Sequence, residues 1–282
     1  MNYAFFAGHD SFYLREGWLR KGILAIREDS AIFSSANLTK AIDTLGVGAN
    51  MVKAVRYWLE VCYLIEKESS GKTSFSLTWL AQHIMERDPY FQKNETLWLL
   101  HYYYSCNVPL WEILFQKNTL PSFSKPQAKQ LISMDVAEKQ LHYSTSTLSS
   151  ALDVFLSTYT WDRTANSRNP EDNLISPFNR LKLLIKEKDQ YSFHSVLDKD
   201  ISPLFLYFLV FADGKKEISM ADAIERIRNY VPMVSSSARA GLEALELKKM
   251  IRVERTAGLN MIYDKRMLPL ADLVQEMLGG NK

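Results

Sequence analysis

Cysteine is almost missing from this sequence, which has only Cys62 and Cys106 among its 282 residues. Two thiols are too few for a disulfide scaffold or for a zinc site built of thiolates. Both side chains are expected to be small buried hydrophobic groups in a reducing compartment. The sequence therefore predicts a cytoplasmic protein.

Long hydrophobic runs are missing as well. The longest uninterrupted apolar stretch is 203–212, far below the ~18 residues of a membrane span. Residues 1–4 lack the basic segment of a signal peptide. We therefore expect neither export nor a membrane partner.

Glycine and proline are sparse, at 11 and 9 residues, and long segments show the hydrophobic period of a helix. Short strand-like runs occur only beside such segments, as at 251–253 and 261–263. The apolar fraction of 47% is enough to bury a core. The predicted fold is mainly α with small β-hairpin wings.

The first 90 residues show a recognisable order of elements. Helices are expected at about 11–27, 37–45 and 50–64, with Asn50 capping the third. The segments 65–67 and 74–77, on either side of a turn at 69–71, then favour a β-hairpin. Three helices followed by a hairpin is the order of a winged helix-turn-helix.

The third predicted helix has two distinct faces. Its inward positions are Val52, Val55, Leu59 and Cys62. Its outward positions include Asn50, Lys53, Arg56 and Tyr57. No acidic residue occurs from 45 to 59, which suits a recognition helix in a DNA major groove. Arg15, Arg20 and Lys21 of the first predicted helix are assigned to the same DNA surface. The alternatives are a solvated helix face and a protein-binding module.

The C-terminal part repeats this order. Helices are expected at 203–212, 219–230 and 235–247, and strands at 250–254 and 259–263 around a turn at 257–258. Arg239 lies in the third helix, while Arg252 and Arg255 lie in the hairpin, where Glu254 is the only acid. We assign these arginines to DNA phosphates. The equally weighted alternative is that basic residues at the helix end complement the helix dipole.

The middle of the chain is strongly aromatic, with a predicted helix at 97–104. Such a stripe can stack nucleobases, but a core or subunit interface is the favoured interpretation. Residues 144–147 are expected to cap another helix, and the polar stretch 161–173 reads as a loop. The predicted domains are a winged helix at 1–90, a helical middle at 91–200 and a second winged helix at 201–282.

Several segments resemble a bacterial family catalogued only as a domain of unknown function. They are 8–12 (GHDSF), 15–19 (REGWL), 21–22 (KG), 45–52 (LGVGANMV), 56–59 (RYWL), 88–90 (DPY), 96–102 (TLWLLHY), 171–172 (ED) and 176–177 (SP). The family includes SspB, the DNA-nicking subunit of a single-strand DNA phosphorothioation system in phage defence. The resemblance implies a DNA partner. It also implies, as protein partners, a cysteine desulfurase, an ATPase and an ATP-pyrophosphatase-like protein.

Nicking hydrolyses a phosphodiester, and such chemistry commonly uses divalent metals held by carboxylates. No Pro-Asp…Glu-x-Lys nuclease pattern and no His-x-His pair is present. The nearest candidates are His9 as base or ligand, Asp10 as metal ligand and Glu16, with Arg15 as a phosphate clamp. The expected metal is Mg²⁺ or Mn²⁺. The structural alternative makes Asp10 or Ser11 the cap of the first helix and Arg15 and Glu16 its surface.

The net charge of +2 argues against a strongly basic nucleic-acid binder, but binding needs only local basic faces. The sequence thus predicts a DNA-binding, strand-nicking component of a phosphorothioate modification and phage-defence system. Metal-dependent endonuclease activity is the favoured mechanism. The alternative is a non-catalytic reader of DNA sites, or a scaffold, that recruits the sulfur-transfer machinery.

Overall fold

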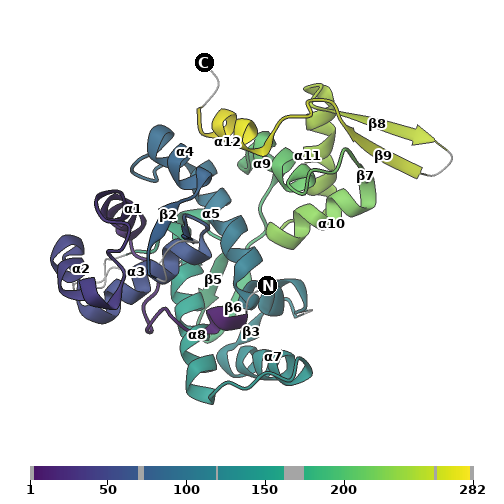
Figure 1. Ribbon diagram of the computed structural model, residues 1–282. Coiled ribbons are helices and arrows are strands. Elements are labelled where there is room, and N and C mark those ends of the chain that lie inside the picture. Colours follow the sequence, from purple (N-terminus) through teal and green to yellow (C-terminus); the bar gives the residue numbers. More distant parts are fainter. Residues whose placement is uncertain (1–2, 69–72, 119, 162–174, 257–258, 280–282) are drawn as a thin grey trace. The chain divides into compact units, whose positions relative to one another are not determined.

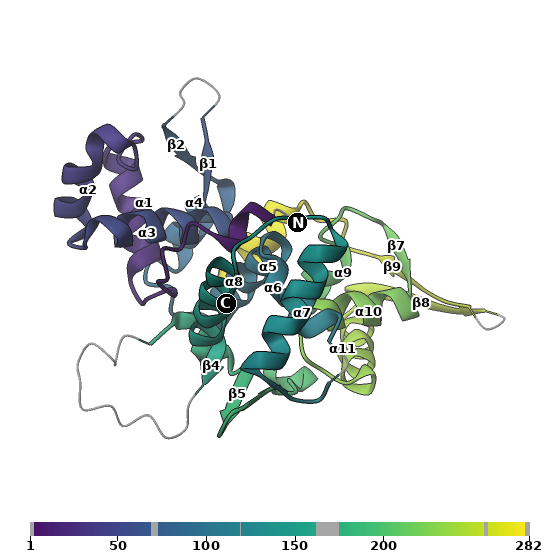
Figure 2. The same cartoon turned by 90° about the horizontal axis from the view of Figure 1, so that it is seen from below.

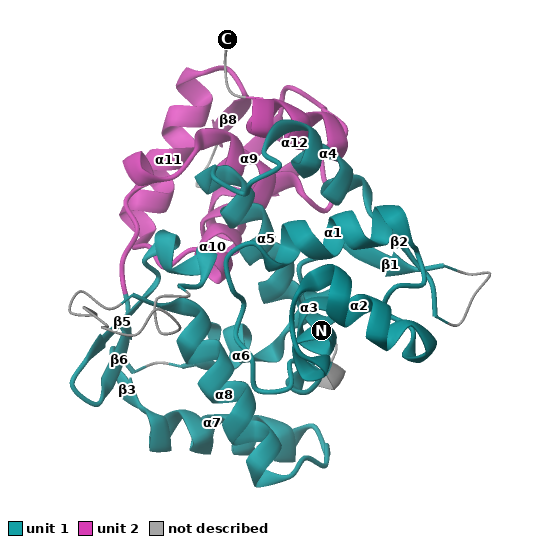
Figure 3. Cartoon of the chain, turned by 90° about the vertical axis from the view of Figure 1, so that its left-hand side faces the viewer, with its two compact units in different colours: residues 1–193 teal, residues 194–282 magenta. Residues whose placement is uncertain are grey.

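The computed structural model describes residues 3–68, 73–118, 120–161, 175–256 and 259–279. The predicted turns at 69–71 and 257–258, most of the predicted loop at 161–173 and the segment 171–172 lie outside these residues. The chain forms two compact units, residues 1–193 and 194–282 (Figure 3). The boundary expected near residue 90 falls inside the first unit, and the one expected near 200 lies close to the start of the second.

Unit 1 begins with three helices and a hairpin (Figure 1). The elements are α1 (Trp18–Glu28), α2 (Leu38–Leu45), α3 (Ala49–Val61), β1 (Ile65–Lys67) and β2 (Phe75–Leu77), with short 3-10 turns at Tyr3–Phe6 and Ser35–Asn37. The two strands are antiparallel and pair Ile65 with Leu77. Figure 2 shows them side by side beyond α3 and α4 (Trp79–Arg87). The second and third predicted helices and the hairpin are confirmed.

The first helix begins seven residues later than expected, at Trp18 and not at residue 11. Asp10, Ser11 and Gly17 have φ values of 44°, 65° and 78°, which are incompatible with a continuous right-handed helix. Asp10 and Ser11 are therefore not its cap, and the structural alternative for them is wrong. Arg15 and Glu16 lie in the loop before α1. Asn50 is likewise not a cap, because Gly48 precedes α3 and Asn50 lies in its first turn.

The rest of unit 1 is helical around one small sheet. Its helices are α5 (Asn94–Asn107), α6 (Pro109–Trp111), α7 (Lys125–Glu138) and α8 (Thr145–Tyr159), with a π-turn at Glu112–Gln116 and a 3-10 turn at Pro177–Leu181. Its strands are β3 (Phe123–Ser124), β4 (Thr160–Trp161), β5 (Leu184–Glu187) and β6 (Gln190–Phe193). They pair in the order β3-β6-β5-β4, and β4 runs parallel to β5 while the other pairs are antiparallel.

The aromatic middle is core. Tyr104 of α5 is 1% exposed and stacks on Trp58 of α3 with ring centroids 5.6 Å apart. His101 is fully buried, and its Nδ1 lies 2.7 Å from the Tyr159 hydroxyl. Trp111 is also fully buried. These contacts confirm the core interpretation for the inward side of the stripe, and the Ser144 side chain caps α8 as expected.

Unit 2 contains the three predicted C-terminal helices and the hairpin. Its elements are a 3-10 turn at Asp198–Asp200, α9 (Pro203–Phe211), β7 (Glu217–Ser219), α10 (Met220–Tyr230), α11 (Ser235–Leu247), β8 (Ile251–Thr256), β9 (Leu259–Asp264) and α12 (Leu270–Gly279). The strands form an antiparallel sheet in the order β7-β9-β8, and the β8–β9 hairpin extends away from α10 and α11 (Figure 1). The sequence predicted neither β7 nor α12.

The molecule is mainly helical with small sheets, as predicted. Within the described ranges, every helix is too short or too polar to traverse a lipid bilayer.

Candidate functional site

The turn at residues 8–11 forms one side of a groove rich in serine. Two adjoining hollows of about 310 and 360 Å³ share Ser11, Ser146 and Ser150. We call this combined hollow the serine groove. Its opposite side is formed by α8, from Ser146 to Ser157, and the hydroxyls of Ser11 and Ser150 lie 2.8 Å apart. Gly8 permits the turn, because its φ is +102° and a Cβ there would lie 3.1 Å from the Tyr57 ring.

His9 lies beneath this turn and is only 4% exposed. Its Nδ1 accepts a hydrogen bond of 3.0 Å from the Ser11 N–H, which places the proton of the neutral ring on Nε2. Nε2 is buried without a hydrogen-bond partner among the described residues. Burial lowers the His9 pKa, partly opposed by the Phe6 backbone and the Asp10 charge. His9 thus has no free lone pair here, so this arrangement favours support of the turn over a role as base or ligand.

Asp10 and Lys53 meet at the edge of the groove. The Lys53 Nζ lies 3.5 Å from the Asp10 carboxylate, and the side chains are 56% and 31% exposed. Nζ also donates to the Asn50 Oδ1 at 3.3 Å. A partly exposed carboxylate and ammonium here are accessible to a solvated phosphodiester.

A divalent cation at this edge would have Asp10 as its protein ligand. No group of three His, Cys, Asp or Glu side chains is arranged around a common metal position in the described part of the chain. Mg²⁺, however, often takes only one or two carboxylates and fills its remaining positions with water and substrate phosphates. The partly exposed carboxylate of Asp10 fits that mode of binding.

On the outer face of α3, Tyr57 is buried and not exposed as predicted. This side chain is 4% exposed, and its hydroxyl donates to the Phe5 carbonyl at 2.9 Å. The prediction that Tyr57 faces DNA is wrong, because the N-terminal segment covers this end of the face. Asn50 and Lys53 are exposed, and Arg56 is half-buried with its Nε 3.8 Å from Glu60. Lys21 donates to the Leu45 carbonyl at 3.2 Å.

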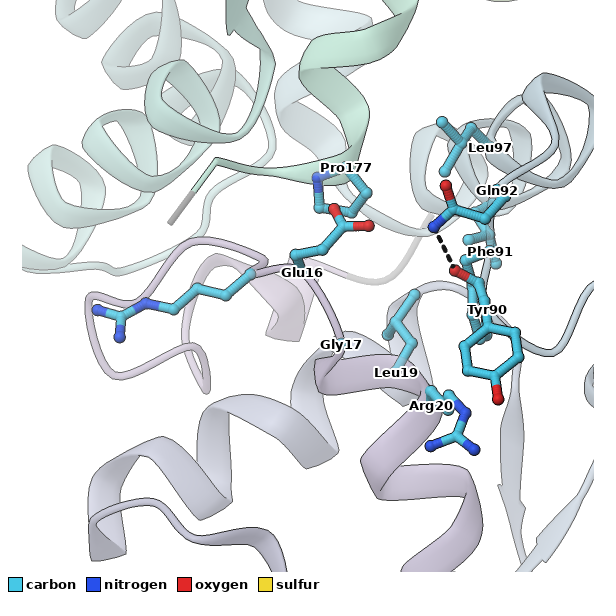
Figure 4. Close-up of a pocket in the computed structure, with 11 residues that line it drawn as sticks. Glu16, Gly17, Leu19, Arg20, Tyr90, Phe91, Gln92, Leu97 and Pro177 are labelled. Carbon is cyan, nitrogen blue, oxygen red and sulfur yellow. Dashed lines mark hydrogen bonds between the residues drawn. The ribbon is translucent and has the colours of Figure 1, made fainter. Parts of the chain in front are cut away.

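Glu16 lies in a different place from His9 and Asp10. It lines a cavity of about 190 Å³ together with Arg15, Arg20 and residues of the loop before α5 (Figure 4). We call it the arginine-rimmed cavity. Its walls are mostly apolar and include Gly17, Leu19, Phe91, Leu97, Leu100 and Pro177. The expected grouping of His9, Asp10 and Glu16 is therefore divided between two hollows.

Of the charged side chains that line this cavity, Glu16 has an ion-pair partner, whereas Arg15 and Arg20 have none among the described residues. The Glu16 carboxylate lies 3.8 Å from the Arg180 guanidinium, which also donates to the Phe91 carbonyl. The Arg20 guanidinium lies 4.8 Å from the Tyr90 ring centroid. Arg15 packs among aromatic rings 5.4 to 5.7 Å away, those of Phe12, Tyr13 and Trp18. Across the described residues, neither Arg15 nor Arg20 forms an ion pair, so both guanidinium groups retain uncompensated charge.

Asp88 fixes the loop that forms the cavity rim. Its carboxylate is 5% exposed and accepts hydrogen bonds from the N–H groups of Gln92 and Lys93 and from the Thr96 hydroxyl, at 2.8, 2.9 and 2.6 Å. A turn follows Asp88 at residues 89–90, and the Phe91 N–H donates to the Asp88 carbonyl at 2.9 Å. The sequence did not predict Tyr90 and Gln92 as site residues. The one sequence signal for this part of the cavity was the segment 88–90 of the family resemblance.

Two of the three arginines of unit 2 that the sequence assigns to DNA are paired with carboxylates. Arg252 lies 2.9 Å from Glu254, and Arg255 lies 2.8 Å from Glu246 of α11. The local order of the hairpin sequence did not reveal Glu246 as a partner, because it belongs to another element. Arg239 is exposed on α11 and forms no ion pair with any described residue.

Two comparisons with known proteins find matches. Two crystal structures of SspB, one of them magnesium ion-bound, share the fold with TM-scores of 0.81 and 0.78 at 20% sequence identity. The alignment covers 96% of this chain and 86% of SspB in both cases. No protein of curated function matches the chain. The family described as "Protein of unknown function (DUF4007)" matches residues 6–271. Because this match spans nearly the whole sequence, the chain belongs to the DUF4007 family.

Proposed function

We propose that this protein is a DNA-binding, strand-nicking component of a bacterial DNA phosphorothioate modification and phage-defence system. The fold shared with SspB and the sequence resemblance support the pathway. The observation that carries the proposal is the Asp10–Lys53 pair at the edge of the serine groove. Cleavage of a phosphodiester needs a positive group for the phosphate and a position for a metal or nucleophile.

The roles follow from this geometry. Lys53 binds a DNA phosphate oxygen, and Asp10 would hold Mg²⁺ or Mn²⁺. Such a metal, when bound, supplies Lewis-acid polarisation of the phosphoryl group. His9 acts as a positioning residue through the Ser11 N–H, and the exposed face of α3 contributes Asn50 and Arg56 to DNA contact. Double-stranded DNA, the cysteine desulfurase, the ATPase and the ATP-pyrophosphatase-like protein are the proposed partners.

Nicking of supercoiled plasmid by the purified protein tests the proposal. We expect open-circular product with Mg²⁺ or Mn²⁺ and none with a chelator. Asp10→Asn should lower the nicking rate by at least tenfold, because it removes the charge that holds the cation. Asp43→Asn is the matched control, since Asp43 is exposed on α2 and lies outside both hollows. Equal nicking by Asp10→Asn and the control would assign the activity to another site or to contaminating nuclease.

A non-catalytic reader of DNA sites is the second candidate, and the arrangement of unit 2 supports it. The order α9, β7, α10, α11, β8, β9, with a three-stranded sheet, supports the proposal of a winged helix in unit 2. In such a module α11 would be the recognition helix, and Arg239 lies exposed on it. This function predicts binding without metal, and no nicking. Arg239→Ala should weaken binding about tenfold, whereas Arg87→Ala, at an exposed position on α4, should not. Nicking that disappears in Asp10→Asn would favour the first candidate.

A further inference from the structure

We propose that the arginine-rimmed cavity receives a single unstacked DNA base, with the neighbouring phosphates held by Arg15 and Arg20. This inference rests on the proposed DNA binding and identifies a second contact surface in unit 1, separate from the serine groove. Four properties of the cavity carry it: its size, its apolar walls, its polar rim and the positive charge beside it.

The size and lining fit one heterocyclic ring system. The volume of about 190 Å³ is below the ~300–1,000 Å³ of pockets that hold drug-sized molecules. The walls contributed by Leu19, Leu97 and Leu100 are aliphatic, and Phe91 adds an aromatic ring. Apolar walls of this kind receive the faces of a flat base, as in enzymes that take a base out of the stack.

The rim offers groups for the edge of a base. Figure 4 shows Glu16 on one side of the cavity, beside Pro177, and Gln92 and Tyr90 on the other. The Gln92 Nε2 donates to the Tyr90 carbonyl at 3.1 Å. The Oε1 of the same amide points away from that bond and can accept a hydrogen bond from a base. The Glu16 carboxylate is 49% exposed and is a second acceptor. Two acceptors suit the amino and imino N–H groups of a base.

The charge beside the cavity favours DNA over an apolar protein side chain. Arg15 and Arg20 line the cavity, and neither has a carboxylate partner among the described residues. A hydrophobic side chain inserted from a protein would leave both charges unused, whereas a nucleotide brings one phosphate on each side of its base. Tyr90, which is 63% exposed beneath the Arg20 guanidinium, adds a platform for stacking.

The test compares two short single strands of equal length, one of mixed base sequence and one an abasic backbone with the same phosphates. The intact full-length protein should bind the base-containing strand about tenfold more tightly, the contribution expected of one stacked base. Tyr90→Ala and Gln92→Ala should reduce that preference, and Tyr90→Phe should restore it. Arg20→Ala should weaken the binding of both strands.

Met134→Ala is the matched control, because Met134 is 60% exposed on α7 of the same unit and lies outside the cavity. It should retain the full preference. Equal affinity of the wild-type protein for both strands would overturn the cavity assignment and leave DNA binding intact. A preference that persists in Tyr90→Ala and Gln92→Ala would place the base elsewhere. Failure to bind either strand or duplex DNA would overturn the proposed function together with this inference.

Discussion

His9 shows how burial changes the chemistry of a single side chain. The sequence offers a histidine next to an aspartate, a pair typical of acid–base or metal chemistry. The structure buries the ring against Tyr57 and uses Nδ1 as an acceptor. The local sequence predicts neither the burial of the ring nor the acceptor role of Nδ1. Tyr57 is 48 positions away along the chain and contacts His9 only because of the fold. For the same reason, the burial of Tyr57 itself could not be predicted from the pattern of α3.

The lowered pKa of His9 predicts a pH-dependent stability. The unfolded chain takes up the proton near the ordinary value of 6.5, whereas the folded chain resists it, so protonation favours unfolding. The free energy of unfolding should be flat with respect to His9 above about pH 7.5 and fall as the pH drops below about 6.5, by no more than ~1.4 kcal/mol per pH unit.

Urea unfolding at several pH values measures this effect. His9→Gln should lessen the loss of stability on acidification, while His142→Gln, at an exposed position, should leave it unchanged. An identical pH dependence in wild type and His9→Gln would contradict the assignment of the lowered pKa to this buried ring.

At the scale of the elements, Gly22 of α1 packs directly against side chains of α3. A Cβ there would lie 2.6 Å from Leu59 Cδ1 and 2.9 Å from Val55 Cγ1, both on buried side chains. Alanine within a helix is normally more stable than glycine by roughly 0.5–1 kcal/mol. Here overpacking should prevail, and Gly22→Ala should destabilise unit 1 by ~1–3 kcal/mol.

Thermal and urea unfolding of Gly22→Ala measure that cost, with Gly48→Ser as control. Gly48 precedes α3 with an extended backbone and open space around it, and serine is a good residue for a helix N-cap. The control should be as stable as the wild type or slightly more so. A stabilised Gly22→Ala would show that the two helices can separate without loss.

Elements with a strong local pattern were predictable. The amphipathic segment of α2, the apolar α9 and the two hairpins all follow from residue spacing and turn residues. The strands β3 and β4 did not follow, since each has two residues and exists only through a distant partner, as Phe123 pairs with Tyr191. The start of α1 was missed because the left-handed residues before it include Asp10 and Ser11, which are also common helix caps.

At the scale of the whole molecule, the net charge of +2 does not show which cationic side chains already have a carboxylate partner. Arg252 and Arg255 already have carboxylate partners, so a phosphate must displace these. Arg15, Arg20 and Arg239 form no ion pair with a described residue. Arg252 and Arg255 should therefore contribute less to the salt dependence of DNA binding than Arg15, Arg20 and Arg239, because each must exchange a carboxylate for a phosphate before it can displace counterions from DNA.

A salt titration of DNA affinity measures the number of phosphate contacts. Lys53→Ala should reduce the slope of log K against log salt by about 0.9, the value of one phosphate contact on duplex DNA. Lys129→Ala, at an exposed position on α7, should leave the slope unchanged. An unaltered slope in Lys53→Ala would remove this lysine, and with it the Asp10 edge, from the DNA interface.

The three hydrogen bonds that Asp88 accepts also bear on the timing of base capture. The loop that presents Tyr90 and Gln92 is tied to a buried carboxylate at Gln92, Lys93 and Thr96, so we expect the rim to keep this shape when DNA binds. A conformational change of the protein is then not the slow step of the proposed base binding. The rate at which a base enters should follow how often that base leaves its own stack, which makes frayed ends, gaps and mispairs the sites that this protein samples first.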